Sequence, residues 1–249
     1  MCTLSILRLK SGYSFMMNRD ESPARPQPDQ IRQATVEGEG AEARRVLYPV
    51  DPSSNGTWVG ANDKGVVLAL MNQYPAGYEK PPKTDSRGRL IPEGLRAGTA
   101  ITALERVAAL DLGATPPFLL VGVDEEGAPL SLGWDGKHLE RKLYPDGALQ
   151  LSSSGFQPNE VLPAREAQFD LALQAIEGKD EPEVLAAQEA YHFSQEPEPG
   201  ATAVWMTRPE ARTVSFAHYL VLPKKIHLRY LDREAHDAQE APVVLQLAR

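Results

Sequence analysis

The chain has 249 residues, with 26 Lys and Arg against 34 Asp and Glu, which gives a formal charge of -8 at pH 7. This acidic balance argues against nucleic acid and anionic membrane surfaces as main partners, and no apolar run is long enough to predict a membrane span. The single cysteine, Cys2, excludes an internal disulfide and a multi-cysteine metal site.

In the first half of the chain, the hydrophobic pattern predicts strands separated by loops. Residues 22–45 and 73–93 are rich in Pro, Gly and charge, which indicates surface loops. The run 66–71 is apolar without alternation, as expected of a strand that is buried on both faces. The predicted strands are 3–9, 13–17, 57–61, 65–71 and 118–123, and a helix is expected over 95–110 with Ile101, Leu104 and Ala108 on one face.

In the second half, strands and helices alternate in blocks. The predicted strands are 129–134, 138–144, 148–152, 202–206, 213–220 and 226–231. The predicted helices are 159–176, with Leu162, Phe169, Leu173 and Ile176 on one stripe, and 182–191. Buried strands combined with hairpins require two stacked antiparallel sheets with helices outside. The sequence therefore predicts an α+β fold, a four-layer αββα sandwich, in a single domain over residues 1–249.

The first two strands place a charged segment beside the N-terminus. If their turn centres on residues 11 and 12, Cys2 faces Glu21, and a loop changed by one residue puts Asp20 opposite Cys2 instead. By strand alternation Arg19 and Glu21 share one face, while Asn18 and Asp20 share the other. The sequence leaves this choice open.

A cysteine at the start of a processed chain can act as a nucleophile without a catalytic histidine. After removal of Met1, the α-amine of Cys2 has a reference pKa near ~8, which suits a general base at neutral pH. A nearby carboxylate could orient that amine and Arg19 could favour the thiolate. Acyl transfer also needs oxyanion donors, and Asn72 at the end of a buried strand offers a side-chain amide.

Each of these residues also has a structural interpretation. Cys2 is equally explained as a small buried hydrophobe, Asn72 as a strand-ending turn residue, and Arg19 with Asp20 as a surface ion pair. His192 is interpreted as a helix C-terminal residue rather than a ligand, and the five histidines show no metal-ligand spacing. The loop 73–93 is either a lid over substrate or a plain surface loop.

Several motifs in this order resemble the NRDE family, which includes transport and Golgi organisation protein 2. The motifs are Met1-Cys2-Thr3, Asn18-Arg19-Asp20-Glu21, Arg25-Pro26, Gly56-Thr57-Trp58-Val59-Gly60 and Met71-Asn72. The rest of the chain is similar more loosely, through Leu151-Ser152-Ser153-Ser154 and the closing strands. The family is similar in layout to N-terminal nucleophile (Ntn) hydrolases of the choloylglycine hydrolase and penicillin V acylase type, which have an αββα fold.

The resemblance implies roles for particular residues. It implies Cys2 as nucleophile after Met1 removal, Arg19 near the thiolate, Asp20 as the acid and Asn72 near the oxyanion. It further places Asn18, Glu21, Trp58 and Ser153 at the substrate. The family commonly carries an Asn near Ser152–Ser154, where this chain has serines.

Two functions from different classes follow from the resemblance. The first is an amidohydrolase that cleaves a non-peptide C–N (N-acyl) bond through an acyl-enzyme on Cys2 and needs no cofactor. The second is a non-enzymatic carrier or chaperone that handles haem or lipid-linked molecules, with Cys2 or a histidine as axial haem ligand. A family member with neither activity is the third option. A small molecule is the expected partner, no secretory signal is visible, and the chain is expected to be cytoplasmic. The sequence names neither the substrate nor the oligomeric state.

Overall fold

In the computed structural model, which describes residues 2–28, 30–79 and 81–249, the chain divides into two compact units. The first unit contains the segment up to Arg25 together with Gly147–Val221 and His227–Leu245. The second contains Pro26–Asp146, Leu222–Ile226 and Gln246–Arg249. The chain passes between the units several times, and the single domain expected from the sequence stays a prediction.

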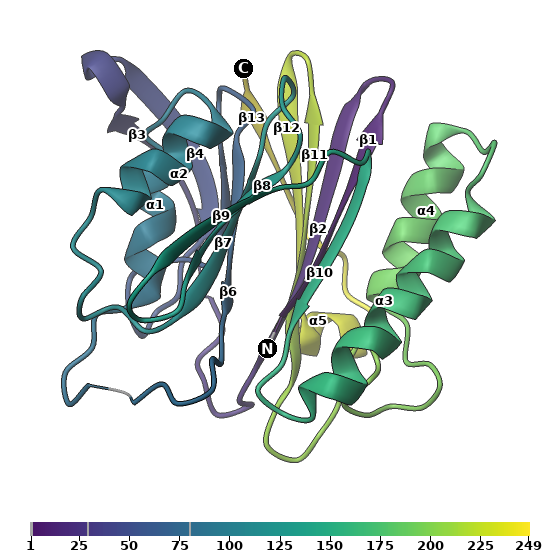
Figure 1. The fold of residues 1–249 in the computed structure, drawn as a ribbon. Coiled ribbons are helices and arrows are strands. Elements are labelled where there is room, and N and C mark those ends of the chain that lie inside the picture. Colours follow the sequence, from purple (N-terminus) through teal and green to yellow (C-terminus); the bar gives the residue numbers. More distant parts are fainter. Residues whose placement is uncertain (1, 29, 80) are drawn as a thin grey trace. The chain divides into compact units, whose positions relative to one another are not determined.

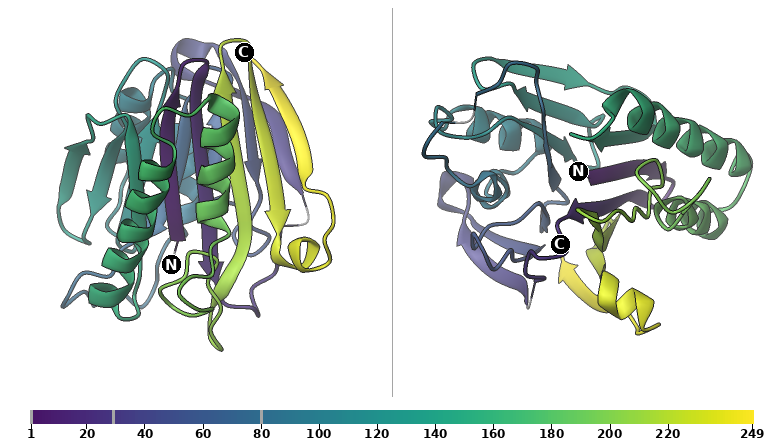
Figure 2. Two further views of the ribbon diagram at one scale, coloured as in Figure 1. Left: turned by 90° about the vertical axis from the view of Figure 1, so that its right-hand side faces the viewer. Right: turned by 90° about the horizontal axis from the view of Figure 1, so that it is seen from below.

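The first unit is built on a six-stranded sheet with the order β10-β1-β2-β11-β12-β13. The strands of this sheet are β1 (Cys2–Leu9), β2 (Gly12–Glu21), β10 (Ala148–Ser153), β11 (Arg212–Leu222), β12 (Lys225–Asp232) and β13 (Val243–Ala248). The end of β11, the start of β12 and the second half of β13 are grouped with the second unit. Its helices are α3 (Pro158–Ala175), α4 (Glu181–His192) and the short α5 (Arg233–Asp237). The helices α3 and α4 lie side by side against β1, β2 and β10, as Figures 1 and 2 show.

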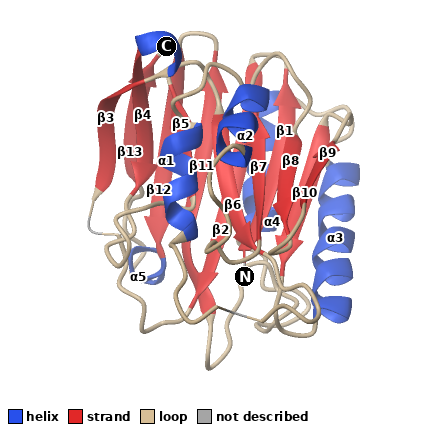
Figure 3. Ribbon diagram, turned by 60° about the vertical axis from the view of Figure 1, so that its left-hand side comes forward, coloured by secondary structure: helices blue, strands red, loops and turns tan. Residues whose placement is uncertain are grey.

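The second unit is built on a seven-stranded sheet with the order β3-β4-β5-β6-β7-β8-β9. Its strands are β3 (Ile31–Glu37), β4 (Ala43–Pro49), β5 (Val59–Asn62), β6 (Val67–Asn72), β7 (Phe118–Val123), β8 (Leu130–Trp134) and β9 (Leu139–Leu143). The short 3-10 turns η1 (Glu39–Ala41) and η2 (Arg87–Arg89) and the helices α1 (Leu90–Gly94) and α2 (Ala100–Ala108) complete it. Both helices pack on the middle strands (Figure 3) and bury an apolar cluster that includes Leu68, Leu104 and Phe118.

The prediction of a surface loop over residues 22–45 is wrong, because this segment contains β3 and the first three residues of β4. Exposed and partly buried residues alternate along β3, which is the pattern of an edge strand with one face on the protein. Its polar residues hid that alternation. In β4, charged Arg44 and Arg45 likewise precede the buried run that starts at Val46.

Two helices and one strand also differ from the sequence prediction. The expected helix over 95–110 begins only at Ala100, because Thr99 and Thr102 form a reciprocal capping box. Ile101, which was expected on the buried face, is 55% exposed. A separate helix, α1, lies in the predicted loop 73–93. The expected strand over 202–206 is irregular although Val204 and Trp205 are fully buried, and its apolar run therefore fills the core without joining a sheet.

The buried stripe of α3 runs through Val161, Arg165 and Phe169, which lie four residues apart. The sequence analysis placed Leu162 on this stripe and overlooked Arg165, because an arginine does not count as an apolar residue. Phe169 of α3 packs with Tyr191 of α4 and Leu7 of β1 in one buried apolar cluster.

Candidate active site

The β1–β2 hairpin places Arg19 directly opposite Cys2. Leu9 pairs with Gly12, so the turn consists of Lys10 and Ser11 rather than of residues 11 and 12. Both registers considered from the sequence, with Glu21 or Asp20 opposite Cys2, are therefore wrong. The reason is that Gly12, a typical turn residue, is here the first residue of β2.

Cys2 lies between two polar partners on the same face of the sheet. Ser153 of β10 pairs with Cys2 on one side and Arg19 of β2 on the other, while Ser215 of β11 pairs with Arg19. Residues opposite one another in antiparallel strands point to the same face, so the sheet carries a polar row from β10 to β11. Cys2, Arg19 and Ser153 are 8%, 6% and 9% exposed.

The hydroxyl of Ser153 has no hydrogen-bond partner among the residues that the structure describes. A buried hydroxyl without a partner costs free energy, and such groups are found where another molecule supplies the missing bond. Ser153 therefore offers a polar atom directly beside the cysteine. The sequence prediction that Ser153 binds substrate is compatible with this geometry and remains untested.

Burial raises the pKa of the Cys2 thiol above its ordinary value, since desolvation disfavours the thiolate. The negative charge of Asp20 acts in the same direction. The positive charge of the N-terminus lowers the pKa most, followed by a hydrogen bond from the Asp20 backbone and the charge of Arg19, but together they do not outweigh burial. The resting cysteine is accordingly a protonated thiol, and a base must remove its proton before or during any attack.

Asp20 turns its carboxylate to the opposite face from Cys2. There Asp20 Oδ2 lies 3.1 Å from Arg165 Nη1, and Asp20 Oδ1 accepts a hydrogen bond from Thr213 Oγ1 at 2.7 Å. Both side chains of the Asp20–Arg165 ion pair are 0% exposed. Arg165 Nη1 also donates to Thr3 Oγ1 at 2.7 Å, so this ion pair ties α3 to β1 and β2 directly behind Cys2.

Sequence reasoning missed Arg165, although its spacing from Val161 and Phe169 is a signal that can be found. The role of Asp20 as an acid that orients the Cys2 amine stays a prediction. In an antiparallel pair the nitrogen of Cys2 lies on the side of Asp20, because Asp20 follows the residue opposite Cys2. The backbone of Asp20 is therefore beside that nitrogen, while its carboxylate is held by the helix.

Asn18 has a structural role that leaves it no group for a substrate. It is 0% exposed, and its Nδ2 donates to the carbonyl oxygens of His192 and Val204 at 2.7 and 3.0 Å. Its Oδ1 lies 3.0 Å from His192 Nδ1, and His192 Nε2 lies 2.7 Å from Ser5 Oγ. The expectation that Asn18 binds substrate does not fit these contacts, whereas the interpretation of His192 as a structural residue does.

Glu21 lies at the end of β2 with 31% of its side chain exposed. Its Oε2 is 3.9 Å from Arg19 Nη2 and 3.6 Å from Arg25 Nη1. Glu21 therefore stands beside Arg19 on the face that carries Cys2 and is the most accessible of the predicted polar residues in this unit. A role in binding substrate stays a prediction.

Asn72 and Trp58 belong to the second unit. Asn72 is the last residue of β6 and pairs with Phe118, and Trp58 is 6% exposed. The two glycines that flank Trp58 have packing roles: a Cβ on Gly56 would lie 2.5 Å from the backbone of Gly88, and one on Gly60 would lie 2.9 Å from Leu95 and Tyr48. That motif is explained by close packing, and the catalytic role of Asn72 stays a prediction.

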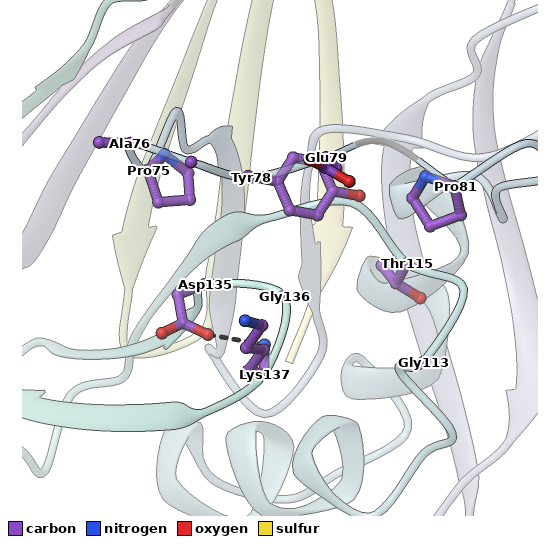
Figure 4. A pocket seen from close by; sticks show the side chains of 11 residues that line it. Pro75, Ala76, Tyr78, Glu79, Pro81, Gly113, Thr115, Asp135, Gly136 and Lys137 are labelled. Carbon is purple, nitrogen blue, oxygen red and sulfur yellow. Dashed lines mark hydrogen bonds between the residues drawn. The ribbon is translucent and has the colours of Figure 1, made fainter.

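The loop after Asn72 lines a cavity of about 500 Å³ in the second unit. Figure 4 shows Tyr78 and Glu79 of this loop above Asp135 and Lys137 of the β8–β9 turn. Asp135 Oδ1 accepts the backbone N–H groups of Lys137 and His138, which holds the turn in place and lowers the pKa of the Asp135 carboxyl. This loop therefore forms one wall of an open cavity, and a function as a lid stays a prediction.

Over the described part of the chain, no cluster of three or more His, Cys, Asp and Glu side chains could hold a metal ion. Within the same residues, no helix is long and apolar enough to cross a membrane.

Comparison with solved structures defines the class of fold. Penicillin V acylase from Agrobacterium tumefaciens matches with a TM-score of 0.59 and 10% identity, over 100% of this chain and 86% of that chain. An N-acylethanolamine-hydrolyzing acid amidase orthologue from Caenorhabditis elegans matches with a TM-score of 0.58 and 14% identity, over 98% and 100%. A variant of conjugated bile acid hydrolase from Clostridium perfringens gives 0.54 and 12%, over 100% and 97%.

At these identities the likeness shows the fold alone, and it is the fold of Ntn hydrolases, which confirms the α+β sandwich of two antiparallel sheets predicted from the sequence. No curated protein matches the chain by sequence. The family model of Transport and Golgi organisation 2 matches residues 1–213. The chain therefore belongs to the Transport and Golgi organisation 2 family, as its NRDE motif indicated.

Proposed function

We propose that this protein is an N-terminal-cysteine amidohydrolase that cleaves a non-peptide C–N (N-acyl) bond through an acyl-enzyme on Cys2. The observation that carries the proposal is the buried row in which Ser153 and Arg19 flank Cys2 on one face of the sheet. The hydrolase fold supports it, because the three matched structures are named as an acylase, an amidase and a bile acid hydrolase.

The reaction begins once Met1 has been removed. The free α-amine of Cys2 takes the thiol proton while Sγ attacks the carbonyl carbon of the substrate. The protonated amine then gives this proton to the departing nitrogen, the C–N bond breaks, and a thioester remains on Cys2. Water, deprotonated by the same amine, attacks the thioester, releases the carboxylic acid and returns the thiol.

The surroundings of Cys2 are suited to this sequence of steps. Since burial keeps the thiol protonated, a base must accept its proton before or during the attack, and the adjacent amine can do so without a histidine. Arg19 supplies positive charge opposite the developing thiolate. Ser153 supplies a hydroxyl whose hydrogen bond is not used within the described protein, and in this mechanism it donates to the bound substrate.

Intact mass measurement with an N-acyl arylamide panel of increasing chain length tests the proposal. We expect the purified chain to lack Met1, to gain the mass of one acyl group during turnover, and to lose both this adduct and activity in Cys2→Ala. Ser153→Ala should lower kcat/KM by about tenfold, the effect of one lost hydrogen bond. Ser152→Ala is the matched control, because Ser152 lies next in β10 on the other face, where its Oγ contacts Thr3 Oγ1 at 2.9 Å.

Two results would overturn the mechanism. One is an active protein that retains Met1, because the α-amine of Cys2 would then be part of a peptide bond. The other is undiminished hydrolysis by Cys2→Ala, which would place the nucleophile elsewhere.

A further inference from the structure

The strand β9 forms one edge of the second unit's sheet and is exposed along its whole length. It pairs with β8 on one side, and none of the described strands lies along its other side in the sheet order. Figure 3 shows β9 at the end of the sheet, beyond β8. All five of its residues are exposed, including Leu139 at 41% and Leu143 at 62%. Short length and charged side chains protect an edge strand from unwanted pairing, so a partner for β9 must match its charges.

The backbone groups that point away from β8 can be identified from the bonds at the two ends of the strand. The N–H of Tyr144 donates to the backbone carbonyl oxygen of Pro129 at 2.8 Å, and the backbone carbonyl oxygen of His138 accepts from the N–H of Asp135 at 3.3 Å. In an antiparallel pair, the residues that bond to the neighbour alternate. Positions 140 and 142 therefore bond to β8, while Leu139, Arg141 and Leu143 direct their N–H and C=O groups to the open edge.

The side chains of Leu139, Arg141 and Leu143 share one face by strand alternation, and α2 lies on that face. Arg141 Nη1 is 3.7 Å from Glu105 Oε1 of α2. A shallow groove of about 260 Å³ separates the helix from the edge, and it is lined by Ile101, Leu104, Leu130, Arg141, Lys142 and Leu143. Ile101 is 55% exposed. An exposed apolar strip beside an open edge is typical of an interaction surface.

The residue order of β9, Leu139-Glu140-Arg141-Lys142-Leu143, is complementary to itself when reversed. We propose that a second copy of this chain pairs with β9 in antiparallel orientation, with Arg141 opposite its own copy across a two-fold axis. Leu139 then lies opposite Leu143 twice, on the face with the groove, and Glu140 lies opposite Lys142 twice on the other face. The two seven-stranded sheets become one continuous sheet.

Backbone and side chains select the same register. Placing Arg141 opposite itself matches outward-pointing residues with outward-pointing residues, so that both strands donate and accept along the shared edge. The Glu140–Lys142 pairs fall between the hydrogen-bonded pairs, where side chains approach most closely. A shift of two residues in either direction would set Lys142 opposite Lys142 or Glu140 opposite Glu140.

One contact opposes the dimer, because the two copies of Arg141 carry the same charge. Glu105 lies beside each Arg141 and offsets part of this repulsion. The remaining repulsion between the two Arg141 side chains and the small size of a five-residue edge predict a weak dimer, with a dissociation constant on the order of 10–100 µM. The charge complementarity between two copies of β9 favours a second copy of this chain as the partner. The alternative partner for this edge is a strand of a different protein.

Sedimentation velocity of the purified full chain, from about 1 to 300 µM at low salt, tests the proposal. We expect a monomer–dimer equilibrium that Glu140→Lys weakens by about tenfold, because both cross-strand pairs become repulsive. Lys142→Glu should weaken it similarly. The double variant E140K/K142E exchanges the charges and should restore the dimer to within about threefold. Arg141→Thr removes the repulsion and should tighten it.

The substitutions lie at exposed positions, and circular dichroism and the thermal midpoint of each variant report whether the fold is kept. A chain that stays monomeric over the whole concentration range overturns the proposal and leaves the edge to another partner. A dimer that Glu140→Lys does not weaken, or that the charge exchange fails to restore, also overturns it, since the contact would then lie on another surface.

Discussion

Replacing Arg165 by Met probes the buried ion pair behind Cys2. Arg165 is 0% exposed and makes hydrogen bonds to Thr3, Asp20 and the carbonyl of Ala201 at 2.7, 3.1 and 3.1 Å. The substitution keeps the apolar stem but leaves the Asp20 carboxylate buried without its cation. Removal of one member of a buried pair costs about 3–5 kcal/mol, a large part of the roughly 5–15 kcal/mol that stabilises a typical domain.

Equilibrium urea unfolding followed by circular dichroism measures this cost. We expect Arg165→Met to lower the free energy of unfolding by about 3–5 kcal/mol, and Asp20→Asn to lower it by less, because Asn can still bond Thr213. The double variant should lose less unfolding free energy than the two single variants lose together, by at least about 1 kcal/mol. Arg229→Met is the control. It breaks a half-exposed ion pair with Glu189 and should cost at most about 1 kcal/mol.

A loss below about 1 kcal/mol for Arg165→Met, or strictly additive losses in the double variant, would refute the reasoning. Either result would mean that Arg165 and Asp20 do not depend on one another. The pair would then not hold α3 to the strands that carry Cys2.

Further predictions concern the titration of Cys2 and the polar groups around it. Arg19→Met removes the smallest of the influences that lower the pKa of the Cys2 thiol, so iodoacetamide should label Cys2 more slowly at pH 8, by about twofold; an unchanged rate contradicts this electrostatic role. Asn18→Ala should lower the free energy of unfolding by about 2–4 kcal/mol, since it leaves the buried polar groups of His192 and Val204 without their hydrogen bonds. The KM of any substrate should stay unchanged. Burial lowers the pKa of His192 to about 3 and that of His218 to about 4. The unfolded chain therefore takes up these protons first, and stability should fall below about pH 6.5 by up to about 1.4 kcal/mol per pH unit for each histidine. Urea unfolding at pH 7, 6 and 5 checks this slope, which His218→Gln should reduce. Titration with haemin tests the carrier function considered from the sequence, and a Soret shift that Cys2→Ala abolishes would favour it over the amidase.

The strands with continuous apolar runs were predictable, because burial on both faces leaves a clear pattern. The predicted strand over 118–123 coincides with β7, and the predicted helix over 159–176 differs from α3 by one residue at each end. The short strand β3 was missed because polar residues occupy its alternating positions. The apolar run 202–206 was mistaken for a strand because apolar composition reports burial and not backbone pairing.

For the candidate site, the sequence named three residues that the structure brings together, and their role in catalysis or binding stays a prediction. Cys2, Arg19 and Ser153 were all named, but the hairpin register was not, since one residue in the turn decides which face each side chain takes. Arg165 was overlooked because its partner Asp20 lies 145 residues away in the sequence.

The sequence by itself determined that Cys2 stands at the start of a strand beside the Asn18–Glu21 segment, because a tight hairpin is local and its two strands are adjacent in the chain. It also determined the family, through short motifs in order. Only the tertiary structure decided that Ser153 and Arg19 flank Cys2, that Asp20 turns away to a helix, and that β9 has an open edge. The pairing of Ser153 with Cys2 and the contact of Asp20 with α3 join distant segments of the chain. The face taken by Arg19 and Asp20 depends on the register of a local hairpin, in which a shift of one residue exchanges the two faces.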